Sequence, residues 1–296
     1  MIWKIYNISI KENIKNLMPD KMYLKWLFPK MVGYKLDFRA PKSFNEKLQW
    51  LKIYDRNPYY TKLVDKYEVK KIVKEKIGEK YIIPTLGIWN SFDEICFEDL
   101  PYQFVLKATH DSGSTVVCRN KDCFDILAAQ KKLTEALSQN FFYKGREWPY
   151  KNVKPRIIAE QYLNPGANED LIDYKFMCFN GSVKCCFVCT DRFSKDGLKV
   201  TFFDNKWNKM PFERHYPSSN KDIKKPQNFE RMIYLAEKLS ENIPFVRIDF
   251  YEYLDQIYFG EYTFFPGGGM EEFSPKSWDF KLGSWITLPK KSFNIK

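Results

Sequence analysis

Two strand-like segments near the C-terminus constrain the fold of this chain most strongly. They are FVRIDFY at residues 245–251 and YFGEYTF at residues 258–264, and both are rich in aromatic and β-branched residues. A short polar link of Leu254, Asp255 and Gln256 separates them. Two such runs joined by a short polar link predict an antiparallel hairpin, here with a three-residue loop.

This hairpin brings charged side chains together on one face. With Asp255 at the midpoint, Asp249 lies opposite Glu261 and Arg247 lies opposite Thr263, because side chains alternate along a strand. Like charges directly opposite each other cost up to about 1 kcal/mol, so the two carboxylates need a cation between them. Mg²⁺ is one candidate, with Asp249, Glu261 and Thr263 as oxygen ligands. A salt bridge from Arg247 is the other, and the residues alone leave both open.

The second strand runs into FFPGGGMEEF, in which Pro266 is followed by three glycines. Consecutive glycines allow backbone N–H groups to point toward a ligand. We therefore expect an oxyanion or a substrate carboxylate to bind at this turn.

A second polar constellation is FVLKATHDSGSTVVC at residues 104–118. It predicts a strand that ends near Lys107, a loop containing Ser112, Gly113 and Ser114, and a second strand. Backbone N–H groups and hydroxyls of such a loop can bind phosphate oxygens, and Lys107 supplies a positive charge. The sequence is not a GxxxxGK[ST] phosphate loop, and an ordinary β-turn is the alternative.

The rest of the chain predicts an α+β or α/β protein. We expect a helical stretch over residues 44–77 that stops at Gly78, and a helix over residues 227–242 with Pro226 in its first turn. Strands should dominate from Asp173 onward. We divide the chain into a basic, mainly helical N-terminal region, a lid lobe and a C-terminal lobe with the metal site, which span residues 1–95, 96–159 and 160–296.

Positive charge is concentrated in the N-terminal region. Residues 1–95 hold 19 Lys and Arg against 11 Asp and Glu, which accounts for most of the net charge of +11. Such a surface favours an anionic partner: an acidic glycan, an anionic membrane surface or nucleic acid. The segments MIWKIYNISI at residues 1–10 and KMYLKWLF at residues 21–28 suit either an interfacial helix or core packing.

Cysteine and histidine usage argues against disulfides and structural zinc. The chain has seven cysteines and two histidines, and Cys178, Cys185, Cys186 and Cys189 lie in apolar strand-like runs as small hydrophobic residues. No apolar stretch has the length of a membrane span or the pattern of a secretory signal. We therefore expect a cytoplasmic protein, with possible peripheral contact at the inner face of the membrane.

Together, these motifs resemble the ATP-grasp superfamily. The order is Lys107 and its Ser-Gly-Ser loop, a hinge strand ending IIAEQYL, an Arg-x-Asp strand, a Glu-x-Thr strand and a Pro-Gly turn. More specifically, the chain is similar to the TupA-like ATP-grasp family of bacterial polysaccharide biosynthesis. The segments that carry this resemblance span residues 43–269: SFNEKLQWLKIYDRNP, LVDKYEVKKIV, FVLKATHDSG, DYKFMCFNG, FVRIDFY and YFGEYTFFPGGG.

The resemblance implies an ATP-grasp fold, with ATP held between two α+β lobes, and an ADP-forming carboxylate–amine ligase that works through an acyl phosphate. It implies that Arg247 and Lys107 are catalytic, and that Asp249, Glu261 and Thr263 bind Mg²⁺. ATP-grasp ligases commonly carry Glu-x-Asn where this chain has Glu-x-Thr, so one metal ion is favoured over two. The implied nucleotide-binding residues are Lys107, Ser112, Gly113, Ser114, Glu160, Gln161, Tyr162, Leu163, Asp173, Lys175 and Arg192.

The implied substrates are a uronic-acid surface glycan, or its sugar-nucleotide or lipid-linked precursor, and an amino acid or other amine. Two alternatives remain at this level. One is an ATP-dependent phosphotransferase that acts on a sugar hydroxyl, because kinase chemistry uses the same phosphate and metal contacts. The other is a non-catalytic protein that binds glycan or nucleic acid, although the sequence has no nucleic-acid-binding signature. The sequence does not specify the oligomeric state.

Overall fold

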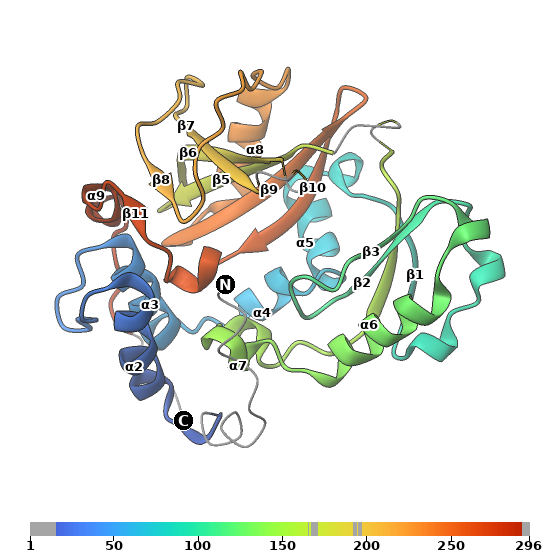
Figure 1. The fold of residues 1–296 in the computed structure, drawn as a ribbon, viewed down its shortest axis with the longest axis horizontal. Helices are drawn as coiled ribbons and strands as arrows, with labels where there is room; N and C mark the ends of the chain where they lie inside the picture. Colours follow the sequence, from blue (N-terminus) through green and yellow to red (C-terminus); the bar gives the residue numbers. More distant parts are fainter. Residues whose placement is uncertain (1–15, 165, 167–170, 192–193, 195–196, 292–296) are drawn as a thin grey trace.

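Two antiparallel sheets form the framework of the protein. The computed structural model describes residues 16–164, 166, 171–191, 194 and 197–291. Figure 1 shows the five-stranded sheet at the upper left and the four-stranded sheet at the right, with helices around and below them. Mixed helices and antiparallel sheets confirm the predicted α+β class.

The small lobe is built on the four-stranded sheet, in the order β1-β4-β2-β3. Its strands and its main helix are β1 (Thr85–Trp89), β2 (Phe104–Ala108), β3 (Val116–Cys118), α6 (Ile126–Ser138) and β4 (Ile157–Gln161). The Asp125 side chain caps α6 by accepting a hydrogen bond from the backbone N–H of Ala128 at 2.9 Å. Phe104, Leu106 and Ile157 pack against Leu133 of α6 in a core that belongs to this lobe alone.

The large lobe is built on the five-stranded sheet, in the order β10-β9-β5-β6-β7. Its elements are β5 (Asp173–Phe179), β6 (Ser182–Thr190), β7 (Lys199–Phe203), β8 (Glu213–Arg214), α8 (Phe229–Ser240), β9 (Phe245–Tyr253), β10 (Gln256–Thr263), β11 (Phe273–Ser274) and α9 (Ser277–Trp285). Consecutive residues of β5 and β6 are buried because both faces of this sheet are covered, which is why these strands read as continuous apolar runs.

The cysteines fit this packing. Cys178, Cys185 and Cys186 are buried in the sheet and Cys189 is half-buried, as expected for small hydrophobic residues. All seven cysteines lie in the described part of the chain and are unpaired there.

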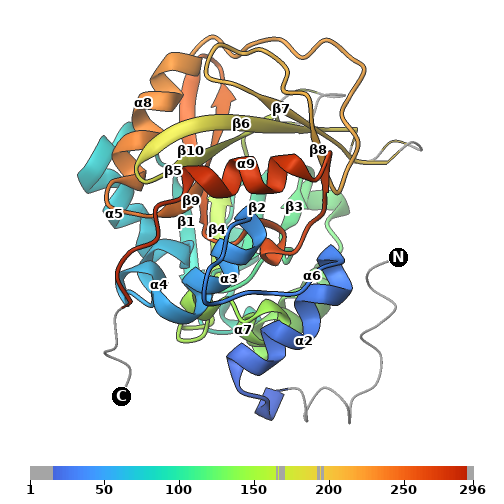
Figure 2. The ribbon, with the colours of Figure 1, turned by 90° about the vertical axis from the view of Figure 1, so that its left-hand side faces the viewer.

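The N-terminal helices share the hydrophobic core of the large lobe. They are α2 (Asp20–Val32), α3 (Phe44–Tyr54), α4 (Tyr59–Val64) and α5 (Glu68–Ile77). A capping box starts α3, in which the Ser43 hydroxyl and the Glu46 carboxylate each accept the other residue's backbone N–H. Figure 2 shows α3 and α9 side by side in front of the large lobe.

Two helix predictions need correction. The predicted helical stretch over residues 44–77 is three helices. Pro58 disfavours a helical conformation at Asn57, and the Asp65 side chain accepts the backbone N–H of Tyr67 just before α5. The predicted stop at Gly78 is confirmed, with φ at +110°. Pro226 does not lie in the first turn of α8, because that helix begins three residues later at Phe229.

The three-part division of the chain stays a prediction. The small-lobe sheet draws its strands from residues 85–161, which extends past both ends of the 96–159 segment.

Core packing is confirmed for KMYLKWLF, whose Tyr23, Leu24 and Phe28 are buried. The segment MIWKIYNISI lies outside the described residues. Within the described part of the chain, no helix has the length and apolar character to cross a membrane.

Candidate functional site

A cleft of about 690 Å³ lies between the two lobes. Ten predicted site residues line it: Lys107, Ser112, Gly113, Glu160, Gln161, Tyr162, Leu163, Asp173, Lys175 and Glu261. They come from β2 and the β2–β3 loop, from β4 and the residues after it, and from β5 and β10 of the large sheet. A volume of this size suits a drug-sized or nucleotide-sized ligand.

The remaining predicted site residues are placed differently. Ser114, Arg247, Asp249 and Thr263 are not among the residues that line the cleft in the described structure. Arg247, Asp249 and Thr263 are each joined to a lining residue by a hydrogen bond or an ion pair. Ser114 follows the lining residue Gly113 in the chain. Arg192 lies outside the described residues.

One end of the cleft is an apolar slot. Its walls come from both lobes and consist of Val69, Ile82, Ile83, Val105, Leu163 and Phe259. The backbone N–H of Gln161 donates to the carbonyl of Pro84 at 3.0 Å, which ties the end of β4 to the segment that precedes β1. A narrow apolar slot beside a strand end suits a flat ring such as a nucleobase.

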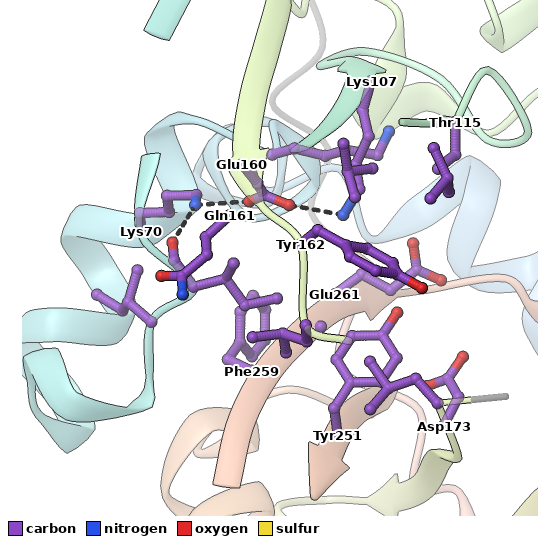
Figure 3. A pocket seen from close by; sticks show the side chains of 18 of the residues that line it. Lys70, Lys107, Thr115, Glu160, Gln161, Tyr162, Asp173, Tyr251, Phe259 and Glu261 are labelled. Carbon is purple, nitrogen blue, oxygen red and sulfur yellow. Dashed lines mark hydrogen bonds and ion pairs between the residues drawn. The ribbon is translucent and has the colours of Figure 1, made fainter. Parts of the chain in front are cut away.

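Glu160 lies between two lysines at the centre of the cleft. Its carboxylate oxygens are 2.5 Å from Nζ of Lys70 and 2.6 Å from Nζ of Lys107, and Figure 3 shows these contacts. Burial alone would raise the pKa of Glu160, but the two lysines outweigh burial and lower this pKa to about 2. Lys70 also donates to the carbonyl of Ile83 at 2.6 Å, so this cluster joins α5 to the small lobe.

The β2–β3 loop is held in shape from inside. The Ser114 hydroxyl accepts from the backbone N–H of Ala108 at 2.9 Å and donates to Asp111 at 2.7 Å, and Ser114 is buried. Gly113 has φ at +103°, a conformation that other residues rarely adopt. Ser112 and Gly113 therefore face the cleft while Ser114 supports the loop, and a phosphate contact of Ser114 stays a prediction.

Lys66 holds the same loop from the large lobe. Its Nζ donates to the carbonyls of Ala108, at 2.9 Å, and of Asp111, and lies 3.6 Å from the Asp111 carboxylate. Lys66 and Asp111 therefore form an ion pair between the two lobes. Burial lowers the pKa of Lys66.

The carboxylate hairpin forms as predicted, but its turn differs. The turn has two central residues, Leu254 and Asp255, with φ at +49° and +60°, so the predicted three-residue loop is wrong. Two-residue turns with positive φ match the twist of the flanking strands, which favours this geometry.

A β-bulge near Gly260 restores the predicted register farther along the hairpin. The strand pairing shifts between Phe259 and Tyr262. The predicted pairing of Arg247 with Thr263 is therefore confirmed.

Arg247 joins the two predicted metal-ligand carboxylates. Its guanidinium contacts Asp249 through two hydrogen bonds of 2.6 Å, and its Nη2 lies 2.7 Å from Oε1 of Glu261. The salt-bridge arrangement is therefore what the structure contains. The Thr263 hydroxyl donates to the same oxygen of Glu261 at 3.1 Å.

Lys175 is a second cation at this cluster, and no sequence pattern predicted its pairing. It lies opposite Asp249 across β5 and β9, and its Nζ is 2.5 Å from Asp249 and also contacts Asp173. Burial opposes ionisation of Asp249, but Arg247 and Lys175 outweigh it and lower the pKa of this carboxylate. Burial raises the pKa of Asp173, and Lys175 only partly offsets this.

The carboxylate geometry fits a divalent cation if Arg247 moves aside. Oδ2 of Asp249 and Oε1 of Glu261 both lie within 2.7 Å of one atom, Nη2 of Arg247, so a small cation near that point can contact both. In the described residues, no group of three or more His, Cys, Asp and Glu side chains is arranged to hold a metal ion. A cation here would therefore depend on Thr263, water and ligand oxygens for the rest of its coordination.

The glycine turn is bound to α3 through its carbonyl groups. Nζ of the fully buried Lys52 lies 2.7 Å from the Gly268 carbonyl and 2.8 Å from that of Gly145, and Gln49 donates to Gly269. The N–H of Gly268 donates to Phe265 at 2.8 Å, so the prediction of free N–H groups is wrong for this residue.

Glu147 lies next to Lys52 and was not found from the sequence. It is buried, and burial raises its pKa to about 7 although Lys52 and Arg247 favour its charged form. Burial also lowers the pKa of Lys52 to about 8. Glu147 lies in none of the motifs, and Lys52 lies in the segment SFNEKLQWLKIYDRNP without an assigned role.

Comparisons with known proteins give one family match. The family described as TupA-like ATPgrasp matches residues 46–287. No curated protein matches the sequence.

Similar solved structures include D-alanine–D-alanine ligase from Bacillus anthracis, at 14% identity and a TM-score of 0.40, which covers 68% of this chain and 56% of that one. The Helicobacter pylori D-alanine–D-alanine ligase has 15% identity and a TM-score of 0.41, covering 84% of this chain and 70% of that one. The ATP-grasp ligase PsnB complexed with minimal precursor has 11% identity and a TM-score of 0.41, covering 75% of this chain and 60% of that one. The chain thus spans a little over half the length of the Bacillus anthracis ligase.

Proposed function

The chain belongs to the TupA-like ATP-grasp family, and from this we propose that it is an ATP-dependent carboxylate–amine ligase. One observation carries the proposal. A single cleft is lined by an apolar slot, by Lys70 and Lys107, and by Glu261, and Arg247 connects Glu261 to Asp249.

The reaction has two steps. A carboxylate oxygen of the first substrate attacks the γ-phosphorus of ATP, and the bond to the β–γ bridging oxygen breaks to release ADP. The amine nitrogen of the second substrate then attacks the acyl-phosphate carbon, inorganic phosphate leaves, and the nitrogen loses a proton as the amide forms. Residues that bind the transferring phosphoryl group and the developing oxyanion account for most of the catalysis.

The nucleotide is proposed to lie along the length of the cleft. Its base occupies the apolar slot beside Gln161, Tyr162 and Leu163, with Asp173 directed toward the ribose. Glu160 lies where it can accept from the base or hold Lys70 and Lys107 in place. Phosphate contacts are proposed for Lys107, Ser112, Gly113, Ser114, Lys175 and Arg192.

Asp249 and Glu261 are proposed to hold Mg²⁺, with Thr263 as the third oxygen. When bound, the metal would neutralise charge on the β- and γ-phosphates. Arg247 then no longer has to neutralise both carboxylates, and its guanidinium can bind the acyl phosphate and the tetrahedral intermediate. The structure supports this exchange because one nitrogen of Arg247 contacts both carboxylates at a point that suits a cation.

The proposed substrates are an acidic glycan or its sugar-nucleotide or lipid-linked precursor, and an amino acid or other amine. The basic excess of residues 1–95 supports an acidic acceptor, because that region holds 19 Lys and Arg against 11 Asp and Glu. We do not expect nucleic acid as a partner.

The test is Mg²⁺-dependent ADP release by the purified protein against a panel of uronate glycans and amines, with product masses measured. An amide product supports ligation, and a phosphate ester would instead establish phosphoryl transfer. Asp249→Asn and Glu261→Gln should each reduce turnover by about a hundredfold or more. Asp222→Asn, at an exposed acid outside the cleft, is the matched control and should leave turnover unchanged. Full turnover in both cleft variants would refute the metal assignment.

A further inference from the structure

One face of the large sheet carries a row of directly paired side chains. Asp249 is paired with Lys175 across β9 and β5. Lys175 is paired in turn with Phe187 on β6, and Phe187 with Phe202 on β7. Paired residues on neighbouring strands point to the same side of a sheet, so this row runs from the carboxylate cluster to two aromatic rings. Arg247 belongs to the same face, and its guanidinium carbon lies 5.7 Å from the Phe187 ring centre.

A second arginine, Arg214, lies over the aromatic end of this row. Its guanidinium carbon is 5.2 Å from the Phe187 ring centre and 5.7 Å from that of Phe202. Arg214 belongs to β8, which pairs with β11 beside the large sheet (Figure 1). Because Arg247 and Arg214 contact the same ring, the face that carries the carboxylate cluster continues as far as Arg214.

Arg214 is buried with its donors poorly satisfied. Only 7% of its side chain is exposed, and within the described part of the chain Nε and Nη1 are buried without a hydrogen-bond partner. Nε lies 2.8 Å from Oε2 of Glu271, but the two groups are not oriented for a hydrogen bond. Arg247, in contrast, makes three hydrogen bonds to Asp249 and Glu261. A ligand that supplies acceptors to Arg214 would therefore gain binding free energy.

Glu271 shows which chemistry fits beside Arg214. Its carboxylate lies against the glycine turn, since a Cβ on Gly267 would be 2.1 Å from the Glu271 carboxyl carbon. Gly267 is exposed, and the Glu271 side chain is 21% exposed, so this side of Arg214 reaches solvent. The Glu271 backbone is fixed because its carbonyl accepts from the Asn45 side chain at 2.8 Å. The carboxylate can therefore leave Arg214 only by rotation of its own side chain.

We propose that Arg214 binds a second, non-reacting carboxylate of the substrate, and that Glu271 is its counter-ion until that carboxylate arrives. A guanidinium binds a carboxylate best through two parallel N–H bonds, which Glu271 does not provide. A purely structural ion pair explains the site less well, because no hydrogen bond joins the two side chains. The proposal rests on the ligase assignment for the identity of the substrate. The carboxylate comes from either a uronate or an amino acid, because both carry the same group.

The test is a titration of the ¹⁵N-labelled full-length protein with acetate, without nucleotide and at constant ionic strength. Binding is followed by the backbone amide signals of Tyr216 and Glu272, which flank Arg214 and Glu271. Glu271→Gln should tighten acetate binding by about threefold or more, because the competing carboxylate is removed. Arg214→Gln should weaken it by about tenfold or more, and Arg214→Lys by about threefold, because lysine keeps the charge but loses the planar fork. If Arg214→Gln does not fold, Arg214→Lys and Glu271→Gln carry the test.

The matched control is Arg56→Gln, which removes an ion pair of 2.6 Å with Asp20 and should leave acetate binding unchanged. To identify the source, D-glucuronate and L-alanine are each compared with their carboxamides. A preference for either acid over its amide supports the proposal, and the tighter acid assigns the source.

Three results would overturn the proposal. They are no amide shift with acetate in the unaltered protein and in Glu271→Gln, equal weakening in Arg56→Gln, and acetate affinity that Glu271→Gln and the Arg214 variants leave unchanged. The last result is the one expected of a structural ion pair. Because no step uses ATP or turnover, this titration and the ADP-release assay can fail independently.

Discussion

Glu160 and Glu147 are buried glutamates in two regions of the same site, yet their pKa values move in opposite directions. Glu160 has lysines at 2.5 and 2.6 Å and a pKa of about 2. Glu147 has a pKa of about 7, and among the described residues no cation lies within ion-pairing distance of it. Its neighbour Lys52 donates instead to two carbonyls. For these two buried glutamates, direct contact with cations therefore separates a lowered pKa from a raised one.

Glu160→Gln should have the largest effect. It leaves Lys70 and Lys107 without their anion in a buried position, so the free energy of unfolding should fall by about 3–5 kcal/mol. Urea denaturation at pH 7 measures this loss. A loss below about 1 kcal/mol would show that the lysines find other partners easily and would break the contrast with Glu147.

Lys52→Met should have an intermediate effect. It removes two hydrogen bonds from an ammonium group to the Gly145 and Gly268 carbonyls, which should lower the free energy of unfolding by about 2 kcal/mol. It also removes the nearest positive charge from Glu147, so the pKa of Glu147 should rise further. A fall in this pKa, measured by carboxyl NMR, would contradict the assigned electrostatics.

Glu147→Gln should stabilise the protein modestly, and only at high pH. Native Glu147 holds its proton up to about pH 7, whereas the unfolded chain releases it near 4.5. The native state therefore binds more protons in that window, and the stability of the unaltered protein falls as pH rises through it. The variant lacks this loss and should be more stable than the unaltered protein at pH 8, with no difference below about pH 4.5.

Chemical denaturation across the pH range measures this effect. Glu75→Gln, on an exposed face of α5, is the matched control and should change stability by less than about 0.5 kcal/mol at every pH. A Glu147→Gln variant that is less stable at pH 8 would mean that this carboxylate is charged and paired in solution.

The last test needs no substitution: it is a direct pH titration of the carboxyl groups in the unaltered protein. The Glu147 carboxyl signal should shift near pH 7, and the Glu160 signal should stay that of a carboxylate down to about pH 2. Because the pKa of Glu160 is lowered, its contribution to stability is complete above about 4.5 and is lost as pH falls toward 2. Equal midpoints for the two signals would remove the distinction between the two regions.

The sequence predicted local pairings better than distant ones. Alternation along two neighbouring strands was enough to predict the pairing of Arg247 with Thr263, because the hairpin is local. The pairing of Lys175 with Asp249 depends on sheet order, and no pattern in either strand specifies which strands become neighbours. Lys70 and Glu160 lie 90 positions apart in different lobes, so only the assembled fold shows their ion pair.

Two further differences between prediction and structure are the hairpin turn and the burial of Lys52. A two-residue turn and a later bulge hold the same number of residues as a three-residue loop without a bulge, so residue counting could not distinguish them. No role was predicted for Lys52, which lies in a helix with apolar residues on several sides. Its complete burial follows from the packing of the glycine turn on α3, which the helix sequence does not reveal.

The two lobes have separate hydrophobic cores, and this has a consequence for how the molecule opens. The contacts between them around residues 65–70 are mainly ionic or polar, through Asp65 to Arg156, Lys66 to Asp111 and Lys70 to Glu160. Units with separate cores can unfold separately. We expect amide hydrogen exchange to show the small lobe as its own cooperative unit, and a ligand that spans the cleft to slow exchange in both lobes together.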